Sequence, residues 1–415
     1  MILRPYQEVG RDFLASRTRA LLADQMRVGK TPQAILACQK IAARRVLVVC
    51  PAIAVEHWRR EWMKWADRPA TVLDRGVWAS DGVVIASYNR AVMMRAELAQ
   101  VKWDVFIVDE CHFAKNPDAQ RTKAVFGKEG LGWQSQRIWA LSGTPAPKHA
   151  GELWPILRAF GVVGCSYTDF TRQFCTFDWT QKITGTKVDR IPALRALMEP
   201  IVLRRTRKEV APEMPEIDFQ FLEVRPTSTP DESGIPAEIL TDEQLLAWLE
   251  SNAASAQEMR IKTALAKVGP LAEEIVEAFE GGLLTSTVVF GYHIAPLAKL
   301  LNELSKAGLK AEMLSGATPK AKKQQIQDDF LAGKLQVVVG QVLAAGTAID
   351  LSAASHGYFL ELDWVSGVNA QAASRLVNMQ SKEPVSFDVV TWPGSTDDRV
   401  QRVLTRRSLE LSQLY

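Results

Sequence analysis

The chain has 415 residues, of which 47% are hydrophobic and 23% are charged, and its formal net charge is +3. This composition is typical of a folded globular protein and excludes a disordered or fibrous chain. The length predicts two or three domains, and a net charge this small does not by itself indicate nucleic-acid binding.

The first predicted element leads into a candidate phosphate-binding loop. Helical spacing covers residues 6–22, and the sequence ADQMRVGKT follows at 23–31. In such a loop, backbone N–H groups surround the phosphates, a lysine binds the β and γ oxygens, and a threonine hydroxyl holds Mg²⁺. Residues of these types close the loop here: Gly29, Lys30 and Thr31. The complete pattern has glycine where this chain has Asp24, so the motif alone leaves a chance basic loop as an alternative.

Short apolar strands alternate with helices over the first 150 residues. The predicted strands cover residues 45–50, 83–86, 103–108 and 138–141, and a helix is predicted at 54–65. Continuous β-branched runs of this length are typical of parallel strands that are buried on both faces. The alternation therefore predicts a doubly wound α/β domain with polar residues at its strand ends.

Two of these strands end in residues that suit ATP hydrolysis. One runs into Asp109, Glu110, Cys111 and His112, and the other is followed by Ser142, Gly143 and Thr144. One carboxylate at such a position can hold Mg²⁺, and a second can polarise the attacking water. The alternatives are a solvated strand end for the acidic pair and a simple turn for the second motif. His112 is either a locally hydrogen-bonded histidine or a residue that couples the nucleotide to the second half of the chain.

Taken in order, these motifs resemble those of superfamily 2 helicases and, more narrowly, those of the Swi/Snf family of DNA-translocating ATPases. The resemblance rests on Gln7 in RPYQ, GKT with Gln33, CPAIAVEHWRREW at 50–62, DECH with Lys115-Asn116, and LSGTP. It implies an α/β fold of two RecA-like doubly wound parallel-sheet lobes with a helical protrusion inserted between them. It also implies ATP as substrate, Mg²⁺ as cofactor, and a monomer that binds duplex or forked DNA without sequence preference.

The same resemblance assigns roles to residues of this chain. ATP-binding residues are Gln7, Gln25, Met26, Arg27, Val28, Gly29, Lys30 and Thr31, and the Mg²⁺ ligands are Thr31 and Asp109. Catalysis involves Lys30, Asp109, Glu110, Gln371 and Arg375, and coupling involves His112, Ser142 and Thr144. DNA contacts are expected from His57, Trp58, Ser87, Tyr88, Lys115, Asn116, Arg204, Arg205, Ser315, Gly346 and Thr347.

Residues 151–225 leave the α/β rhythm and are predicted to be helical. They contain a run of aromatic residues: Trp154, Phe160, Tyr167, Phe170, Phe174, Phe177 and Trp179. We expect these side chains to pack in a core, because buried aromatics dominate cores. The basic sequence LRRTRKEV at 203–210 is either a solvated face or a phosphate-binding surface. This region resembles the protrusion of Swi/Snf motors, particularly that of annealing helicases.

The second half of the chain resembles the first without a phosphate loop of its own. Its predicted elements are a linker at 226–236, a helical region at 241–279, strands at 287–290, 311–314, 335–339 and 357–361, and a helix at 296–307. The segments LSGATPKAKKQQIQDDF, AAGTAIDL and QAASRLVNMQ resemble the later family motifs. The predicted domains are a first lobe at 1–150, the protrusion at 151–225, a linker and helix at 226–259, and a second lobe at 260–415 with a C-terminal brace helix. The two lobes are expected to face each other across one nucleotide.

Three positions depart from the family pattern. Arg27 stands where the family has glycine, and Ala348 and Asp350 replace a glycine and an asparagine in a turn expected to approach DNA. A carboxylate in that turn would repel phosphate. Asn378 replaces the second arginine of the final motif, which would stabilise the transferring phosphoryl group by about 10³- to 10⁵-fold in rate. Its absence predicts a slow ATPase unless a cation of the last helix substitutes: Arg402, Arg406 or Arg407.

The remaining residues point to an ordinary intracellular protein. The five cysteines include no CxxC pair and the five histidines are scattered, so we expect reduced thiols and no zinc site. The apolar runs are the length of strands, which predicts neither a signal peptide nor a membrane span. No accessory module is expected besides the motor.

The sequence thus predicts an ATP-dependent DNA motor that acts in fork remodelling, annealing or branch migration. We expect a small bacterial or phage protein in the bacterial cytoplasm, with an unknown replication or repair partner. Two alternatives remain open. One is an RNA-directed DExH helicase, and the other is an ATP-gated nucleic-acid clamp with little turnover, which Asn378 favours.

Overall fold

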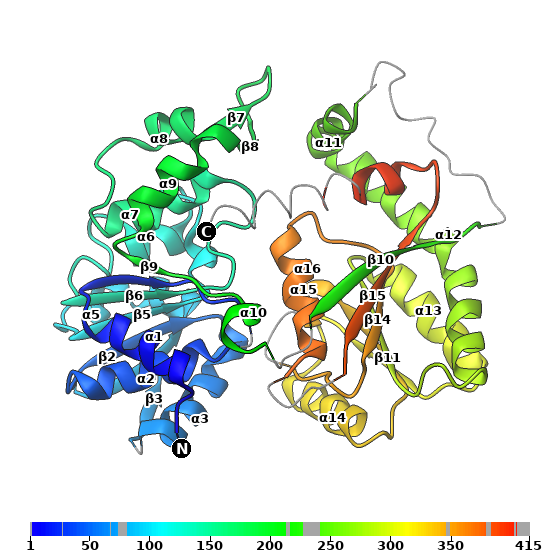
Figure 1. Ribbon diagram of the computed structural model, residues 1–415, viewed down its shortest axis with the longest axis horizontal. Coiled ribbons are helices and arrows are strands. Elements are labelled where there is room, and N and C mark those ends of the chain that lie inside the picture. Colours follow the sequence, from blue (N-terminus) through cyan, green and yellow to red (C-terminus); the bar gives the residue numbers. More distant parts are fainter. Residues whose placement is uncertain are drawn as a thin grey trace. The chain divides into compact units, whose positions relative to one another are not determined.

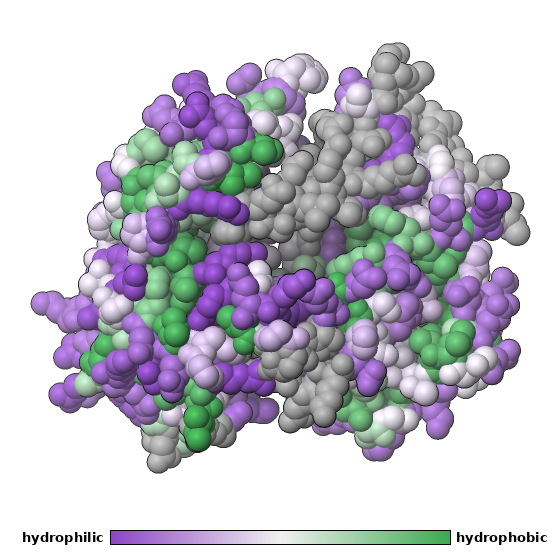
Figure 2. All heavy atoms as spheres, viewed as in Figure 1, coloured by the Kyte–Doolittle hydropathy of each residue, from purple (hydrophilic) through white to green (hydrophobic). Residues whose placement is uncertain are grey.

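The computed structural model describes residues 2–26, 28–66, 68–73, 81–212, 216–226, 241–345, 349–378, 383–401 and 404. The chain divides near residue 212 into two compact units (Figure 1). Figure 2 shows hydrophilic side chains spread over the visible face of both units with apolar side chains between them, as is usual for a globular protein. Among the described helices, none combines the length and the apolar character that a bilayer span requires.

The first unit is built on a seven-stranded parallel sheet with the order β3-β4-β2-β5-β6-β1-β9. Its strands are β1 (Arg19–Leu22), β2 (Val46–Cys50), β3 (Ala70–Val72), β4 (Val83–Ser87), β5 (Val105–Asp109), β6 (Arg137–Leu141) and β9 (Val202–Leu203). The central strands are buried on both faces, as their continuous apolar runs predict. The strands predicted at 45–50, 83–86, 103–108 and 138–141 are therefore confirmed.

Helices cover both faces of this sheet, which confirms the doubly wound α/β fold. On one face, α1 (Pro5–Ala15), α2 (Lys30–Lys40) and α3 (Val55–Ala66) pack in one apolar cluster with the sheet. On the other face lie α4 (Tyr88–Met93), α5 (Arg95–Leu98), α6 (Gln120–Phe126) and α7 (Trp154–Ala159). The helix predicted at 6–22 is wrong in its second half, because α1 ends at Ala15 and Arg19–Leu22 pairs with β6 and β9. Buried Leu21 and Leu22 point to opposite faces of the sheet, which the helical spacing concealed.

The segment between β6 and β9 is less purely helical than the sequence predicts. It contains α8 (Tyr167–Phe174), the antiparallel hairpin β7 (Cys175–Phe177) and β8 (Ile183–Thr186), and α9 (Ile191–Met198). Phe170 and Phe174 are fully buried, and Trp154 and Phe177 pack against the same core. The packing prediction is wrong for Trp179, whose side chain is 92% exposed.

The second unit is built on a six-stranded parallel sheet with the order β10-β15-β14-β11-β13-β12. Its strands are β10 (Ile217–Glu223), β11 (Thr287–Gly291), β12 (Ala311–Leu314), β13 (Val337–Gln341), β14 (His356–Phe359) and β15 (Val385–Thr391). Its helices are α11 (Asp242–Ser251), α12 (Ala253–Glu280), α13 (Ile294–Lys306), α14 (Lys320–Leu331), α15 (Val342–Ala345) and α16 (Ser366–Ala373). Ile217–Glu223 pairs along its whole length with β15, so this end of the segment predicted as the protrusion, 151–225, contributes a strand to the second sheet.

A buried lysine fixes the C-terminal part of this unit. Lys267 of α12 has no exposed surface, and its ammonium donates to the carbonyls of Leu360 and Val390 at 2.7 Å each and to the Asp397 carboxylate at 2.6 Å. Asp397 lies in the helical segment 396–401, where the brace helix is predicted. The lysine therefore holds that segment against α12 within the second unit.

Replacing Lys267 with methionine should lower the free energy of unfolding of this unit by about 3 to 5 kcal/mol, because a buried ion pair that loses one partner leaves an uncompensated charge. Urea unfolding followed by far-ultraviolet circular dichroism measures the change. Lys306→Met is the matched control, since Lys306 forms an exposed pair with Glu303 and such pairs contribute at most about 1 kcal/mol. Equal effects of the two substitutions would contradict the prediction.

Candidate active site

The predicted catalytic motifs meet at the carboxyl edge of the first sheet. β6 lies between β1 and β5 and pairs in parallel with both. The chain leaves β1 into the phosphate loop, β5 ends at Asp109, and β6 is followed by Ser142. Carboxyl ends of adjacent parallel strands form the usual ligand crevice of an open α/β sheet.

The phosphate loop has the backbone that its glycine predicts. Gly29 adopts a left-handed conformation with φ 78° and is followed directly by α2. A Cβ atom at this position would lie 2.5 Å from Nε2 of Gln7. That amide and the Tyr6 hydroxyl both donate to the Val28 carbonyl, at 3.1 and 3.0 Å. Gln7 therefore lies against the loop, and its contact with the nucleotide stays a prediction.

Lysine at the start of α2 lies across the loop. The Lys30 ammonium donates to the carbonyls of Asp24 at 2.9 Å and Gln25 at 3.3 Å. Met26 packs beside the turn after β6, because a Cβ atom on Gly143 would lie 2.8 Å from its Cγ. Arg27, a predicted ATP ligand and a departure from the family pattern, lies outside the described residues.

An arginine that lies about 180 residues later in the chain, near the end of the first unit's sequence, holds this loop in place. The Arg205 guanidinium donates to both carboxylate oxygens of Asp24, to Oε1 of Gln33 at 3.0 Å and to the Tyr6 carbonyl. Asp24 is completely buried and the Arg205 side chain is 12% exposed. These contacts disfavour the predicted DNA contact of Arg205, because its donors are already bound inside the lobe. Asp24, in the place of the usual glycine, was the signal in the sequence: a buried carboxylate requires a cation.

Asp109 is held by an indole. Nε1 of Trp58 donates to its Oδ2 at 2.7 Å, and Trp58 has no exposed surface. Burial and the neighbouring charge of Glu110 raise the pKa of Asp109 above its usual range, while the Trp58 hydrogen bond and the Lys30 charge oppose the shift. The side chain of Trp58 lies in the core and orients the carboxylate, which disfavours its predicted DNA contact.

Glu110 occupies a strained backbone position. Its φ of 48° and ψ of 54° are left-handed, a region that residues other than glycine rarely adopt. The Tyr88 hydroxyl donates to the carbonyls of Asp109 at 2.8 Å and Glu110 at 3.2 Å, and its ring stacks on Phe113. Tyr88 is 4% exposed, which also disfavours its predicted DNA contact. Its hydroxyl instead holds the turn that aims the second carboxylate.

Two of the predicted coupling residues, His112 and Ser142, lie beside that carboxylate, and the third, Thr144, bonds to Ser142. Oγ of Ser142 lies 3.0 Å from Nδ1 of His112 and 3.5 Å from Oε2 of Glu110, and it accepts the Thr144 N–H at 3.2 Å. Nδ1 of His112 is also 3.4 Å from Oε2 of Glu110. Burial, with a smaller contribution from Lys115, lowers the pKa of His112 to about 3. The imidazole is therefore neutral at physiological pH and acts as a hydrogen-bonding partner without charge.

The oxygen donors beside Lys30 suit a magnesium ion. Thr31 follows Lys30 in the first turn of α2, and the charge of Lys30 acts on Asp109. A hydroxyl and a carboxylate are hard oxygen ligands of the kind that Mg²⁺ prefers, together with nucleotide phosphates and water. Thr31 and Asp109 would hold the ion, which when bound neutralises charge on the phosphates.

Comparison with known families identifies the chain. The SNF2-related domain matches residues 6–233, and the helicase conserved C-terminal domain matches residues 271–380. The chain belongs to the SNF2 family. The first match covers more than half of the 415 residues and includes the phosphate loop, Asp109, Glu110 and Ser142.

Relatives of this SNF2 chain come from animals and bacteria. It is 27% identical over 440 residues to the SWI/SNF-related matrix-associated actin-dependent regulator of chromatin subfamily A-like protein 1 of Xenopus tropicalis, covering 99% of this chain and 45% of the relative. It is 26% identical over 451 residues to the putative ATP-dependent helicase/translocase YwqA of Bacillus subtilis, covering 97% and 47%. The chain thus spans about half the length of these relatives. Among solved structures, the Sulfolobus solfataricus SWI2/SNF2 ATPase core in complex with dsDNA has a TM-score of 0.46 and 20% identity, covering 99% of this chain and 92% of that one.

Other predicted DNA contacts of the SNF2 chain stay predictions. In the first unit, His57 and Asn116 are exposed, Ser87 caps α4, Lys115 pairs with Glu152 at 2.7 Å, and Arg204 donates to the Gly143 carbonyl at 3.5 Å. In the second unit, Ser315 is 7% exposed, and its N–H donates to the Thr318 hydroxyl at 3.0 Å. Gly346 and Thr347 lie outside the described residues.

The later motifs of the SNF2 chain include α16 and the turn that follows it in the second unit. Gln371 lies in α16, and Arg375 follows in the short 3-10 turn Ser374–Leu376. Nδ2 of Asn378 donates to Oγ of Ser352 at 2.6 Å, and the Ser352 N–H donates to the Asp350 carboxylate at 3.0 Å. Two of the departures from the family pattern, Asp350 and Asn378, are therefore joined through one serine. Ala348, Arg402, Arg406 and Arg407 lie outside the described residues.

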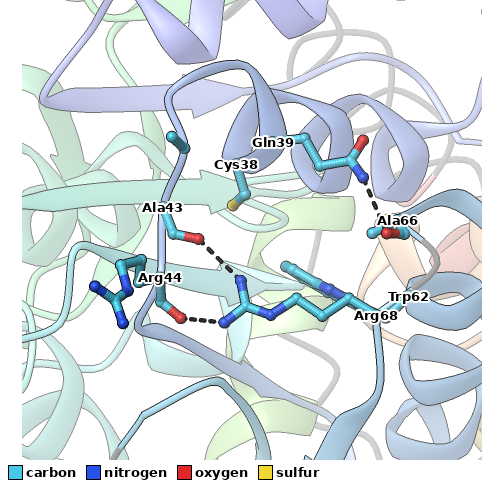
Figure 3. Close-up of a pocket in the computed structure, with 8 residues that line it drawn as sticks. Cys38, Gln39, Ala43, Arg44, Trp62, Ala66 and Arg68 are labelled. Carbon is cyan, nitrogen blue, oxygen red and sulfur yellow. Dashed lines mark hydrogen bonds between the residues drawn. The ribbon is translucent and has the colours of Figure 1, made fainter.

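A small pocket of the SNF2-related domain lies away from these motifs (Figure 3). Cys38 and Gln39 line it at the C-terminal end of α2, and the Arg68 guanidinium closes one wall by donating to the carbonyls of Ala43 and Arg44. The phosphate loop lies at the opposite end of the same helix, about ten residues or roughly 15 Å away. The pocket is thus separate from the candidate active site.

Proposed function

We propose that this chain hydrolyses ATP at the carboxyl edge of its first sheet and uses the cycle to move along DNA. One observation carries the proposal: the loop that contains Gly29 and Lys30 lies beside two carboxylates, one of which is in contact with Ser142 and His112. The name of the Bacillus subtilis relative, a putative ATP-dependent helicase/translocase, supports the same activity.

Each side chain has a distinct part in the proposed reaction. The Lys30 ammonium binds the β and γ phosphate oxygens, and Gln7 contacts the adenine. Glu110 accepts a proton from water as the water oxygen attacks the γ-phosphorus, and the bond from that phosphorus to the β–γ bridging oxygen breaks. The products are ADP and inorganic phosphate. Ser142 and neutral His112 keep the Glu110 carboxylate in place. Because Ser142 begins the turn after β6, a change in the protonation of Glu110 would be felt by that turn and through it by the rest of the lobe.

The proposed substrate is duplex or forked DNA, held through its phosphates and hence without sequence preference. We further propose that the protein acts as a monomer in a bacterial cytoplasm, in fork remodelling, strand annealing or branch migration. Gln371 and Arg375 of the second unit are proposed ligands of the γ-phosphate.

Steady-state ATP hydrolysis by the wild type and by Lys30→Ala tests the proposal. The assay is run without nucleic acid and with single-stranded DNA, duplex DNA, forked DNA and RNA. We expect DNA to stimulate the wild type and Lys30→Ala to be inactive with every polymer, because the substitution removes the phosphate-binding cation. Stimulation by RNA alone would favour an RNA-directed helicase. Absence of turnover with every polymer would overturn the proposal.

A second candidate, an ATP-gated clamp with little turnover, is favoured by one observation. Asn378 stands where the family has an arginine, and its amide is bonded to Ser352 at 2.6 Å. A neutral amide cannot stabilise charge on a transferring phosphoryl group as a guanidinium does. A wild type that binds ATP and DNA but hydrolyses no more ATP than Lys30→Ala would be such a clamp.

A further inference from the structure

The β7–β8 hairpin presents one aromatic side chain to solvent. Trp179 lies in the loop between the two strands and is 92% exposed, whereas Phe170 and Phe174 on the preceding helix are buried. The hairpin extends beyond α8 and α9 in Figure 1. Exposing a large indole is unfavourable, so its place at a loop tip needs another explanation than packing.

Hydrogen bonds hold the loop in one conformation. One oxygen of the Asp178 carboxylate accepts the N–H and the hydroxyl of Thr180, at 2.9 and 2.7 Å, and the N–H of Lys182 at 2.9 Å. The Asp178 N–H in turn donates to the Lys182 carbonyl at 2.9 Å. These bonds to the charged form lower the pKa of Asp178. Trp179 is therefore carried by a closed, preformed turn that needs little further ordering on binding.

The base of the hairpin is fixed to the core of the first unit. Cys175 is fully buried, and Phe177 and Ile183 pack against the large apolar cluster of this unit. The Thr186 hydroxyl accepts the Ala150 N–H at 2.9 Å, and the hydroxyls of Thr176 and Thr184 bond across the strands at 3.0 Å. A force on the tip would therefore be transmitted to the lobe that carries the active-site residues.

Cationic side chains accompany the tryptophan. Lys182 is exposed in the same loop, and Arg172 is exposed on the helix that leads into the hairpin. Arg190, four residues after β8, is also exposed and pairs with Asp189 at 3.5 Å. The Lys187 ammonium donates to the Arg172 carbonyl at 2.7 Å, which places it beside α8. An indole with nearby cations is the combination that binds single-stranded nucleic acid, where bases stack on aromatic rings and phosphates meet positive charge.

A protein partner fits these observations less well. A stable protein interface buries about 800 Å² on each side around an apolar centre, whereas one indole supplies at most about 250 Å². The other residues of the loop tip, Thr180, Gln181 and Lys182, are exposed and polar.

We propose that the β7–β8 hairpin recognises DNA junctions, with Trp179 stacking on an unpaired or terminal base and Lys182 meeting the adjoining phosphates. The inference rests on the proposed function in taking DNA as the partner. In a continuous duplex both faces of each base are covered by neighbouring bases, so the indole finds no stacking partner there. At a fork, an end or a single strand a base face is open. The hairpin would therefore direct a motor that otherwise binds phosphates alone toward the places where a duplex opens.

The test compares two DNAs bound by the full chain in the absence of nucleotide. One is a fork with 2-aminopurine at its first unpaired position, and the other is relaxed, closed-circular duplex DNA used as a competitor. We expect Trp179→Ala to weaken fork binding about tenfold, the size of one lost stacking contact, and to abolish quenching of 2-aminopurine. Affinity for the circular duplex should be unchanged, and Trp179→Phe should retain much of the fork binding and the quenching.

Trp133→Ala is the matched control, because Trp133 is another tryptophan of the same unit and is 49% exposed. This substitution should leave both affinities unchanged. Equal weakening of fork and circle by Trp179→Ala, or no change in either, would overturn the proposal. If Trp179→Ala changed neither DNA affinity but abolished binding of a protein, the hairpin would be the site of that protein and not a DNA-binding element. Because these measurements need no hydrolysis, a wild type without DNA-stimulated ATPase activity would disprove the proposed motor while the test of the hairpin still stands.

Discussion

Replacing Glu110 with glutamine is expected to lower the DNA-stimulated ATPase rate about 10²- to 10⁴-fold, the range that a general base contributes, while ATP binding is retained. Glutamine has the same size, so the left-handed backbone at φ 48° and the Tyr88 contacts to the main chain are kept. Only the carboxylate is lost. His112 cannot replace it, because an imidazole whose pKa is lowered to about 3 by burial is too weak a base.

Two measurements separate this effect from damage to the fold. The rate constant kcat is measured with saturating ATP and forked DNA, and ATP affinity is measured by titration with a fluorescent analogue. Glu129→Gln, an exposed glutamate of the same unit, should match the wild type in both. A rate for Glu110→Gln within threefold of the wild type would show that another group accepts the proton.

Most of the candidate site was predictable because it lies at the ends of strands that the sequence marks clearly. The run VFIV before Asp109 is apolar on both faces of its strand, and parallel strands place their carboxyl ends at one edge. Because Lys30, Asp109 and Ser142 each follow or end such a strand, we could predict that they lie close together without knowing any long-range contact. Gly29 follows the same logic, since its left-handed φ needs glycine whatever surrounds it.

What could not be predicted depends on contacts between residues far apart in the chain. Strand β9 has two residues, too few to show a pattern, yet its pairing with β1 brings Arg205 to the phosphate loop. Strand β10 alternates apolar and polar residues over IDFQF, but its partner β15 lies more than 160 residues later and cannot be inferred from that local pattern. The side chains of Trp58 and Tyr88 each combine an apolar ring with one polar group. Such a side chain suits a DNA-binding surface and a buried hydrogen bond equally, so residue type alone does not distinguish the two.

Removing Arg205 is expected to have the largest effect on stability in the first unit. Arg205→Ala leaves the Asp24 carboxylate, which has no exposed surface, without its cation, and breaking a buried pair in this way lowers the free energy of unfolding by about 3 to 5 kcal/mol. Most of the chain's 12 tryptophans lie within residues 1–212, so urea unfolding followed by indole fluorescence reports mainly on this unit. Arg59→Ala is the control, because Arg59 pairs with Glu56 on the surface of α3 and should contribute at most about 1 kcal/mol.

The double variant Asp24→Asn with Arg205→Ala distinguishes a buried charge from lost packing. Without the carboxylate there is no uncompensated charge, so the double variant should regain at least half of the stability that Arg205→Ala loses. It should not regain ATP affinity, because Gln33 and the Tyr6 carbonyl still lack the guanidinium that joins them to the loop. Recovery of both properties would mean that the arginine only neutralises Asp24. Recovery of stability alone would mean that Arg205 also positions the loop for phosphate, and that the basic segment after the protrusion serves the nucleotide site of its own lobe.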